Sequence, residues 1–255
     1  MILFPNPKIN IGLNVISRRT DGYHNIDTVF YPVMSMTDIL EIVPAKGDST
    51  TLTTSGNPVD CPAEKNLVMK AYRLLDDIHH LPSVDIYLHK VIPDGAGLGG
   101  GSSDAAFTLK ALNEMFSLGY DDDSLASLAA SLGADCSFFI YNRPMFATGI
   151  GTTLSPIDID ISEYEIRIEK PDVSVSTKEA YAGITPQQPA KSLASLFAAN
   201  LPVNEWKDMI FNDFETSIFT KHPEIKAVKE RFYAEGAIYA SMSGSGSAVY
   251  GIFHK

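Results

Sequence analysis

A glycine-rich segment at residues 95–101 restricts this chain more than any other part of its sequence. Five of these seven residues are glycine, two serines follow, and a strand pattern at residues 84–92 precedes a helical pattern that runs to about residue 116. Glycine lets backbone N–H groups line a concavity without a Cβ in the way, and the following helix N-terminus adds roughly half a positive charge. A plain structural turn needs only one or two glycines, so the segment predicts a phosphate-binding loop.

Two familiar phosphate-binding loops fit this segment poorly. A Walker A loop needs Lys followed by Ser or Thr after its last glycine, whereas Gly101 is followed by Ser102 and Ser103. The spacing of Gly95, Gly97 and Gly100 does match the dinucleotide fingerprint G-x-G-x-x-G. That fingerprint also needs a second strand that ends in an acidic residue, and the acidic run at residues 121–123 lies between two predicted helices. A dinucleotide-binding oxidoreductase therefore remains a distant alternative.

Strand and helix patterns mix without regular alternation, which favours an α+β fold over a doubly wound sheet. Apolar and polar residues alternate strictly over residues 8–16, so we predict a half-buried strand whose polar face carries Lys8 and Asn10. We place the N-cap of the helix after the glycine segment among residues 102–104. Other strands are predicted near 26–33, 38–43 and 164–169, helices near 64–75, 124–132 and 223–234, and a final strand pair around a second glycine turn at 241–247.

The composition is that of an ordinary globular protein of one large domain or two modest ones. The chain has 255 residues, of which 45% are hydrophobic and 20% charged, and its net charge is −11. An acidic mean field repels polyanions, so neither nucleic acid nor an anionic membrane is an expected partner. Two cysteines, no secretory signal pattern and no long apolar run predict a cytoplasmic protein with reduced thiols.

Three motifs in order across almost the whole chain resemble those of the GHMP kinases. They are FPNPKINIGLNV at residues 4–15, PDGAGLGGGSSDAA at 93–106, close to the family's Pro-x-x-x-Gly-Leu-Gly-Ser-Ser-Ala, and SMSGSGSAVYG at 241–251. Within that superfamily, RRTDGYH at 18–24 and the long glycine motif are similar to the 4-diphosphocytidyl-2-C-methyl-D-erythritol kinase family. That family transfers the ATP γ-phosphoryl group to the 2-hydroxyl of a cytidine-diphosphate-linked sugar alcohol in non-mevalonate isoprenoid biosynthesis.

The resemblance implies a two-lobed α+β GHMP fold with its active site in the cleft between an N-terminal lobe (1–155) and a C-terminal lobe (156–255). It implies ATP with accompanying Mg²⁺, for which the sequence shows no obvious protein ligand, and a small-molecule substrate; it leaves a homodimer open. Asp135 matches the family's catalytic aspartate, and Lys8 matches its active-site lysine. As an ordinary carboxylate is a weak base towards an alcohol, Asp135 is expected chiefly to orient the hydroxyl, and Lys8 to stabilise negative charge.

The same resemblance implies two groups of binding residues. Tyr23, His24, Asn10, Thr177 and Tyr181 are expected at the cytidyl substrate, with the aromatic rings around the pyrimidine. The residues expected at ATP are Pro93, Asp94, Gly95, Ala96, Gly97, Leu98, Gly99, Gly100, Gly101, Ser102, Ser103, Asn66 and Lys90.

Two further functions stay open at this point. Homoserine and mevalonate kinases share the loop but need no pyrimidine pocket, so Tyr23 and His24 argue against them. A non-catalytic nucleotide-binding protein could keep the loop, but the presence of both Lys8 and Asp135 argues against that function.

Overall fold

The computed structural model describes residues 1–59 and 61–255, which form two compact units built from separate chain segments. Unit 1 comprises residues 1–7, 34–94 and 99–142. Unit 2 comprises residues 8–33, 95–98 and 143–255. The glycine segment is therefore shared, its first four residues in unit 2 and its last three in unit 1. The lobe boundary predicted at residue 155 stays a prediction.

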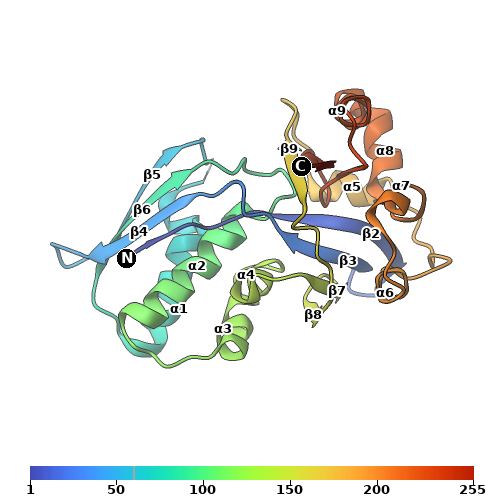
Figure 1. Ribbon diagram of the computed structural model, residues 1–255. Coiled ribbons are helices and arrows are strands. Elements are labelled where there is room, and N and C mark those ends of the chain that lie inside the picture. Colours follow the sequence, from blue (N-terminus) through green and yellow to red (C-terminus); the bar gives the residue numbers. More distant parts are fainter. Residues whose placement is uncertain (60) are drawn as a thin grey trace. The chain divides into compact units, whose positions relative to one another are not determined.

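Unit 1 is a mixed sheet with two long helices against it (Figure 1). The strand order is β1-β4-β6-β5, and only β5 and β6 run parallel. Inward-facing apolar residues of the strands, such as Leu40 and Ile86, are fully buried, as are Leu75 and Leu109 of the helices. Its elements are β1 (Ile2–Leu3), β4 (Ile39–Pro44), β5 (Thr51–Gly56), η1 (Ala63–Lys65), α1 (Leu67–His79), β6 (Val84–Lys90), α2 (Gly100–Met115), α3 (Asp122–Ala129) and α4 (Cys136–Tyr141).

Unit 2 contains two antiparallel sheets, with orders β2-β3-β7-β8 and β10-β11-β9. Apolar side chains of β2 and β3 pack with those of α8, α9 and the second sheet into one core that includes Leu13, Val15, Ile218, Phe232 and Met242. Its elements are β2 (Lys8–Arg18), β3 (His24–Pro32), β7 (Met145–Gly149), β8 (Thr153–Pro156), β9 (Tyr164–Glu169), α5 (Thr177–Ala182), α6 (Leu193–Ala198), η2 (Val203–Glu205), α7 (Trp206–Met209), α8 (Phe214–Lys221), α9 (Pro223–Ala234), β10 (Tyr239–Met242) and β11 (Val249–His254).

The mixed sheets with helices confirm the α+β prediction, and β9, α9 and the final strand pair lie where they were predicted. The predicted N-cap of α2 is wrong. The helix begins at Gly100 with Gly99 as N-cap, and residues 102–104 lie inside the helix. The helix predicted near 124–132 is α3, which spans Asp122–Ala129 and so ends three residues earlier than predicted.

The strict alternation predicted for β2 is also wrong. The register against β3 shifts between Ile11 and Leu13, where Gly12 has a φ of +71°, and it shifts again between Val15 and Ser17. A bulge inserts one residue into the strand and so moves later side chains to the other face. The strand is buried on both faces at its start, because the polar Lys8 and Asn10 are 3% and 2% exposed.

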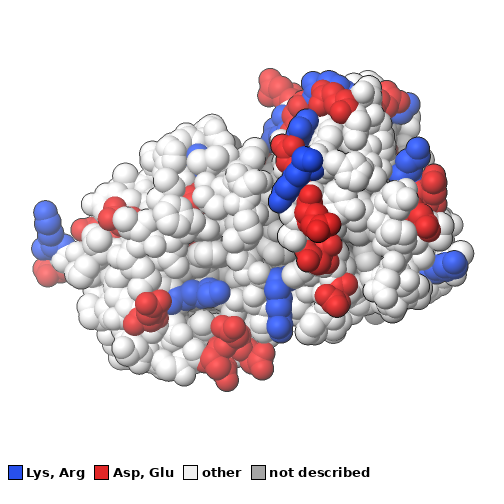
Figure 2. Space-filling model, in the orientation of Figure 1, with Lys and Arg blue, Asp and Glu red and all other residues white. Residues whose placement is uncertain are grey.

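Charged side chains of both signs are interspersed on the face that Figure 2 shows, with much uncharged surface between them. None of the helices in the described part of the chain has the length and apolar character needed to cross a bilayer.

Candidate active site

The last three residues of the glycine segment open helix α2 in unit 1. Gly99, with a φ of +71°, is the N-cap and has no side chain to bond the helix N-terminus. A Cβ on Gly100 would meet Ile92 Cγ2 at 2.9 Å and Lys90 Nζ at 3.3 Å, so only glycine fits there. A helix N-terminus without a side-chain cap keeps backbone N–H groups available for an anion.

The first four residues of the segment lie in unit 2, against the C-terminal glycine turn (residues 241–247). Gly97 has a φ of +77°, and a Cβ there would collide with the Ser243 carbonyl oxygen. Ser243 Oγ donates a hydrogen bond to the Gly97 carbonyl at 2.9 Å, and the Ala248 N–H donates to the Ala96 carbonyl at 3.1 Å. Residues 95–98 of the second motif and the third motif therefore form one packed backbone structure within unit 2.

Lys8 is held by this structure. Its ammonium donates to the Gly97 carbonyl at 2.8 Å and to Asn10 Oδ1 at 2.6 Å, and it lies 5.1 Å from the centre of the Phe30 ring. Asn10 is oriented in turn by a bond from its Nδ2 to Thr28 Oγ1 at 2.9 Å. The first motif thus joins the other two in unit 2, and Asn10 acts there as a partner of Lys8. Its predicted contact with substrate stays a prediction.

Several residues predicted at the nucleotide line one small cavity of unit 1. The cavity has a volume of about 140 Å³, and its lining includes Asn66, Lys90, Asp94 and Gly101. Asn66 is fixed there as the N-cap of α1, since its Oδ1 accepts a bond from the Val68 N–H at 2.9 Å. The structure therefore brings four of the residues predicted at the nucleotide together at one cavity of unit 1.

Lys90 also forms a buried ion triad with Asp38 and Asp104. Its ammonium bonds both carboxylates, with Asp104 Oδ2 at 2.7 Å. Burial raises the pKa of Asp104 to about 7, although the Lys90 charge acts to lower it. For Lys90 itself burial acts to lower the pKa, but the two carboxylates outweigh it and the net pKa is raised. Asp38 also accepts the N–H groups of Val91 and Ile92, so the triad fixes the chain just before the glycine segment.

We expect Lys90→Met to destabilise the protein by about 3–5 kcal/mol near neutral pH, because two buried carboxylates lose their counter-charge. The folded-state pKa of Asp104 lies above its unfolded value, so its favourable contribution is present at acid pH and lost as the pH rises through about 7. The loss of unfolding free energy caused by Lys90→Met should therefore be larger near about pH 8, where Asp104 is ionised, than near about pH 5. Urea unfolding at the two pH values measures it.

Lys226→Met is the matched control for this experiment, because Lys226 is exposed and forms a surface ion pair with Glu230 four residues on. Its change should stay below about 1 kcal/mol at both pH values. Equal losses for Lys90→Met at the two pH values would contradict the triad's proposed electrostatics.

Asp135 lies in unit 1 directly before helix α4. It is the N-cap residue, but its side chain makes no capping bond. The neighbouring Cys136 is buried, and burial raises the pKa of its thiol to about 11, so it is a poor nucleophile.

Two of the predicted cytidyl-binding residues of unit 2, His24 and Tyr181, are in contact. The rings of His24 and Tyr181 stack with centroids 4.8 Å apart and planes at 20°, and Phe214 packs edge-on against Tyr181. Thr177 begins the short helix α5 that carries Tyr181. Tyr23 is 62% exposed, and its N–H is fixed by Asp21 Oδ1 at 3.1 Å. An exposed ring beside a stacked aromatic pair can serve as a platform for a planar base.

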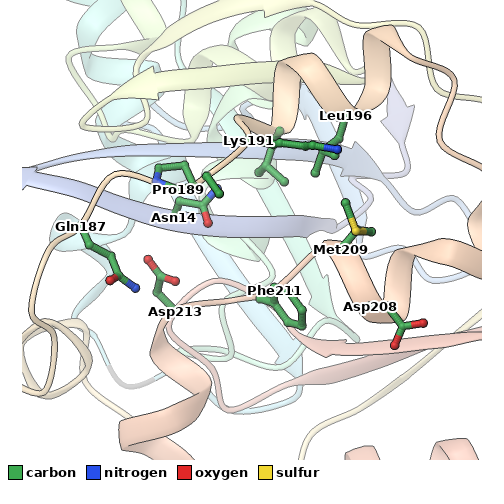
Figure 3. A pocket seen from close by; sticks show the side chains of 11 residues that line it. Asn14, Gln187, Pro189, Lys191, Leu196, Asp208, Met209, Phe211 and Asp213 are labelled. Carbon is green, nitrogen blue, oxygen red and sulfur yellow. The ribbon is translucent and has the colours of Figure 1, made fainter.

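A larger cavity of about 340 Å³ lies elsewhere in unit 2, between β2 and the segments around α6 and α7 (Figure 3). Asn14, Leu193, Phe211 and Asp213 are among its lining residues, and none of the residues predicted from the sequence is. Burial raises the pKa of the Asp213 carboxyl.

The residues present fit a nucleoside triphosphate. The uncapped start of α2 offers N–H groups, and Ser103 Oγ in its first turn is buried without a hydrogen-bond partner among the described residues. No group of three or more His, Cys, Asp or Glu residues in the described ranges could hold a metal ion by itself.

Sequence reasoning missed the support of the site. Asp38 is an isolated carboxylate in the sequence, and nothing in its neighbourhood indicates that it bonds Lys90, 52 positions away. Ser243 lies within the third motif, where the sequence indicates no role for it, although its hydroxyl bonds the glycine segment. The available signal was the second glycine turn, at residues 241–247, which lies far along the chain from the first glycine segment.

Comparison with known proteins places the whole chain among small-molecule kinases. The model of the GHMP kinases N terminal domain matches residues 66–143, and that of the GHMP kinases C terminal matches residues 192–255. The chain is 54% identical over 255 residues to the 4-diphosphocytidyl-2-C-methyl-D-erythritol kinase of Bacteroides thetaiotaomicron, with 99% of this chain and 92% of that protein covered. It is 52% identical to the kinase of the same name from Parabacteroides distasonis, with 100% and 92% covered. A crystal structure of a 4-(cytidine 5'-diphospho)-2C-methyl-D-erythritol kinase matches with a TM-score of 0.80 and 34% identity, covering 99% of this chain and 90% of that chain.

Proposed function

Because this chain belongs to the 4-diphosphocytidyl-2-C-methyl-D-erythritol kinase family of GHMP kinases, we propose how its own residues carry out that family's reaction. The protein is an ATP-dependent small-molecule kinase that phosphorylates the 2-hydroxyl of 4-diphosphocytidyl-2-C-methyl-D-erythritol in isoprenoid precursor biosynthesis. The observation from the fold that best supports the residue roles is the convergence of Lys8, Gly97 and Ser243 in unit 2.

Binding of the nucleotide is assigned to the glycine segment and the cavity beside it. The N–H groups at the start of α2 and the Ser102 and Ser103 hydroxyls hold the phosphates, and Asn66 and Lys90 lie at the nucleoside cavity. ATP supplies the transferred phosphoryl group, with Mg²⁺ bound to its phosphates. Because this transfer has a loose transition state, the protein acts mainly by positioning and by stabilising charge.

Asp135 and Lys8 are assigned the two catalytic roles. Asp135 accepts a hydrogen bond from the substrate hydroxyl, orients its oxygen for attack, and takes the proton late in the transfer. Lys8 places its ammonium charge at the oxygens on which negative charge develops. The Gly97 carbonyl and Asn10 Oδ1 restrict where that ammonium can lie.

The cytidyl group of the substrate is assigned to Tyr23, His24 and Tyr181. Tyr23 offers an exposed ring face for stacking, while the imidazole can bond the edge of a pyrimidine. Thr177 and Asn10 complete the proposed substrate set. We further propose that the enzyme works in the cytoplasm on this small molecule, with neither nucleic acid nor membrane as partner.

Replacing Tyr23 tests this substrate assignment. We expect Tyr23→Ala to weaken stacking by about 1–3 kcal/mol, which raises the KM for the cytidyl substrate roughly 5- to 150-fold. The KM for ATP should stay unchanged, because the change lies outside the proposed nucleotide set. Steady-state kinetics with each substrate varied in turn measures both values.

The conservative Tyr23→Phe keeps the ring face and should retain a KM within about threefold of the wild type. An unchanged KM for the cytidyl substrate in Tyr23→Ala would reject the pocket.

A further inference from the structure

We propose that Asn212 and Glu215 clamp the C-terminal glycine turn and so act as positioning residues for Lys8. The inference rests on the proposed function, in which Lys8 stabilises charge during phosphoryl transfer. Asn212 and Glu215 both bond residues of the turn. Their influence passes through the turn and the Gly97 carbonyl, all within unit 2.

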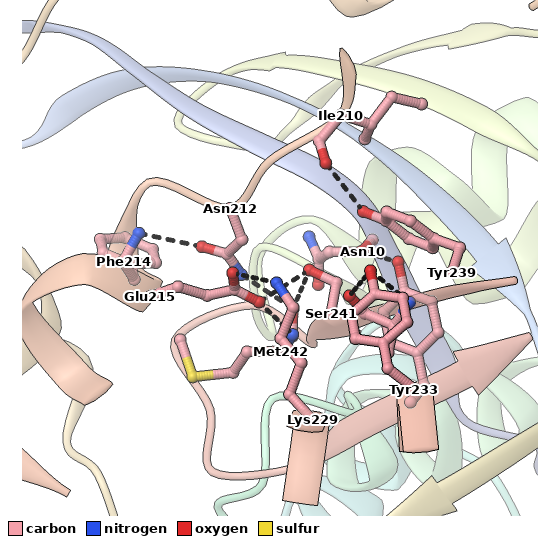
Figure 4. Close-up of polar contacts among 12 residues, drawn as sticks. Asn10, Ile210, Asn212, Phe214, Glu215, Lys229, Tyr233, Tyr239, Ser241 and Met242 are labelled. Carbon is pink, nitrogen blue, oxygen red and sulfur yellow. Dashed lines mark hydrogen bonds and ion pairs between the residues drawn. The ribbon is translucent and has the colours of Figure 1, made fainter. Parts of the chain in front are cut away.

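Asn212 binds the turn at two points, and Figure 4 shows it near Met242, one of the two residues that it bonds. Its Nδ2 donates to the Met242 carbonyl and to the Gly244 carbonyl, each at 2.8 Å, and the residue is 3% exposed. Both amide protons are thereby used on either side of Ser243. Two bonds from one planar group fix the position of the turn at residues 242 and 244, on both sides of that serine.

Glu215 bonds the first two residues of the same turn. Its Oε1 accepts bonds from the Met242 N–H at 2.8 Å and from Ser241 Oγ at 3.1 Å, while its Oε2 pairs with Lys229 at 2.6 Å. The ion pair with Lys229 fixes the orientation of the carboxylate, so that Oε1 faces the turn. Helices α8 and α9 therefore both fix the start of the turn.

The held turn sets the surroundings of Lys8. Ser243 Oγ donates to the Gly97 carbonyl and accepts the Asn10 N–H at 3.3 Å. The Gly97 carbonyl accepts a hydrogen bond from the Lys8 ammonium at 2.8 Å. Gly244 lies close to Asn10, since a Cβ on Gly244 would be 3.2 Å from Asn10 Oδ1. A displacement of the turn would therefore also move the Gly97 carbonyl and Asn10 Oδ1, which accept hydrogen bonds from the Lys8 ammonium.

The backbone around Asn212 is tied to the strand that carries Lys8. The Leu13 N–H donates to the Phe211 carbonyl, and the Asp213 N–H donates to the Leu13 carbonyl, both at 2.9 Å. Asn212 is therefore fixed to β2 by its neighbours and to the glycine turn by its side chain. It sets the spacing between the strand and the turn.

Asn212 also has an ordinary structural role, because its Oδ1 accepts the Phe214 N–H at 3.0 Å at the start of α8. The isosteric Asn212→Asp separates the two roles. It keeps an oxygen for that N–H, but it replaces the amide donor with a carboxylate oxygen that faces two carbonyls. A purely structural residue would lose stability without a specific effect on turnover.

The test compares the kinetics of Asn212→Asp with those of the wild type. We expect kcat to fall about 10- to 100-fold, with KM for ATP and for the cytidyl substrate within about threefold, because only the reacting geometry is disturbed. The kcat relative to the wild type should recover as the pH is lowered, since a protonated carboxyl regains one donor. Asp213→Asn, which keeps an acceptor for the Val15 N–H, is the neighbouring control and should have unchanged kcat.

Amide hydrogen exchange of residues 241–248 in the substrate-free protein gives a second measure that needs no turnover. Asn212→Asp and Glu215→Gln should both speed exchange there, and Asp213→Asn should not; Glu215→Gln also serves if Asn212→Asp fails to fold. Unchanged exchange, or faster exchange with wild-type kcat, would overturn the inference. If the wild-type protein itself leaves the cytidyl substrate unphosphorylated, the proposed function fails, while exchange still decides whether the clamp exists.

Discussion

Asp135→Asn is expected to lower kcat by about 10³-fold while ATP still binds with nearly wild-type affinity. Removal of a positioned acid–base group typically costs about 10²–10⁴-fold in rate. The substitution keeps the shape of the side chain and deletes only its charge and proton affinity. Because the carboxylate makes no capping bond to α4, an amide in its place loses no capping bond there. Single-turnover kinetics together with ATP titration separates the chemical step from nucleotide binding.

Asp122→Asn is the matched control, since Asp122 is an exposed residue in the first turn of α3. It should leave kcat unchanged, and stability within about 0.5 kcal/mol. A near-normal rate in Asp135→Asn would contradict the assignment of Asp135, whatever its effect on stability.

Gly97→Ala is expected to disrupt both glycine loops at once. The new Cβ would collide with the Ser243 carbonyl oxygen, and the backbone there has a φ of +77°, which an L side chain adopts only at a cost of about 1–2 kcal/mol. The Ser243 N–H is bonded to the Ala248 carbonyl, so the turn cannot yield cheaply. We expect kcat/KM to fall roughly 10²-fold or more, as a displacement of about 1 Å can cost that much.

Gly119→Ala is the control that separates the steric collision at residue 97 from the cost of placing an L side chain at a positive φ. Gly119 has a φ of +78°, and nothing lies within 4 Å of the place its Cβ would take. It should lose about 1–2 kcal/mol of stability and keep its activity. If Gly97→Ala behaved like this control, the packing of the two glycine loops in unit 2 would not matter for function.

Local patterns were sufficient to predict much of the fold. The helix at 223–234 has a proline at its first position and Gly236 just past its end, and both signals act within the helix itself. The start of α2 was harder, because the serines after the glycine segment are good caps in isolation. Gly99 takes the cap position instead, since it adopts a positive φ that a serine would resist.

The sequence predicted the residue types at the site but not the residues that hold them in place. The motifs indicated Lys8 and the glycine segment, whereas the burial of Lys8 depends on Gly97 and Phe30, which lie far away in the chain. Alternation over residues 8–16 predicted a solvated polar face, yet no local pattern can show that another segment covers it. The partners of Lys90 were hidden for the same reason.

The central claim is tested most directly by ADP release from Mg-ATP in a coupled assay. The acceptors are 4-diphosphocytidyl-2-C-methyl-D-erythritol, homoserine and mevalonate, each in a separate reaction beside one without acceptor. The account predicts ADP only with the cytidyl substrate. Turnover with homoserine or mevalonate instead, or no turnover with the cytidyl substrate while ATP binds, would contradict it.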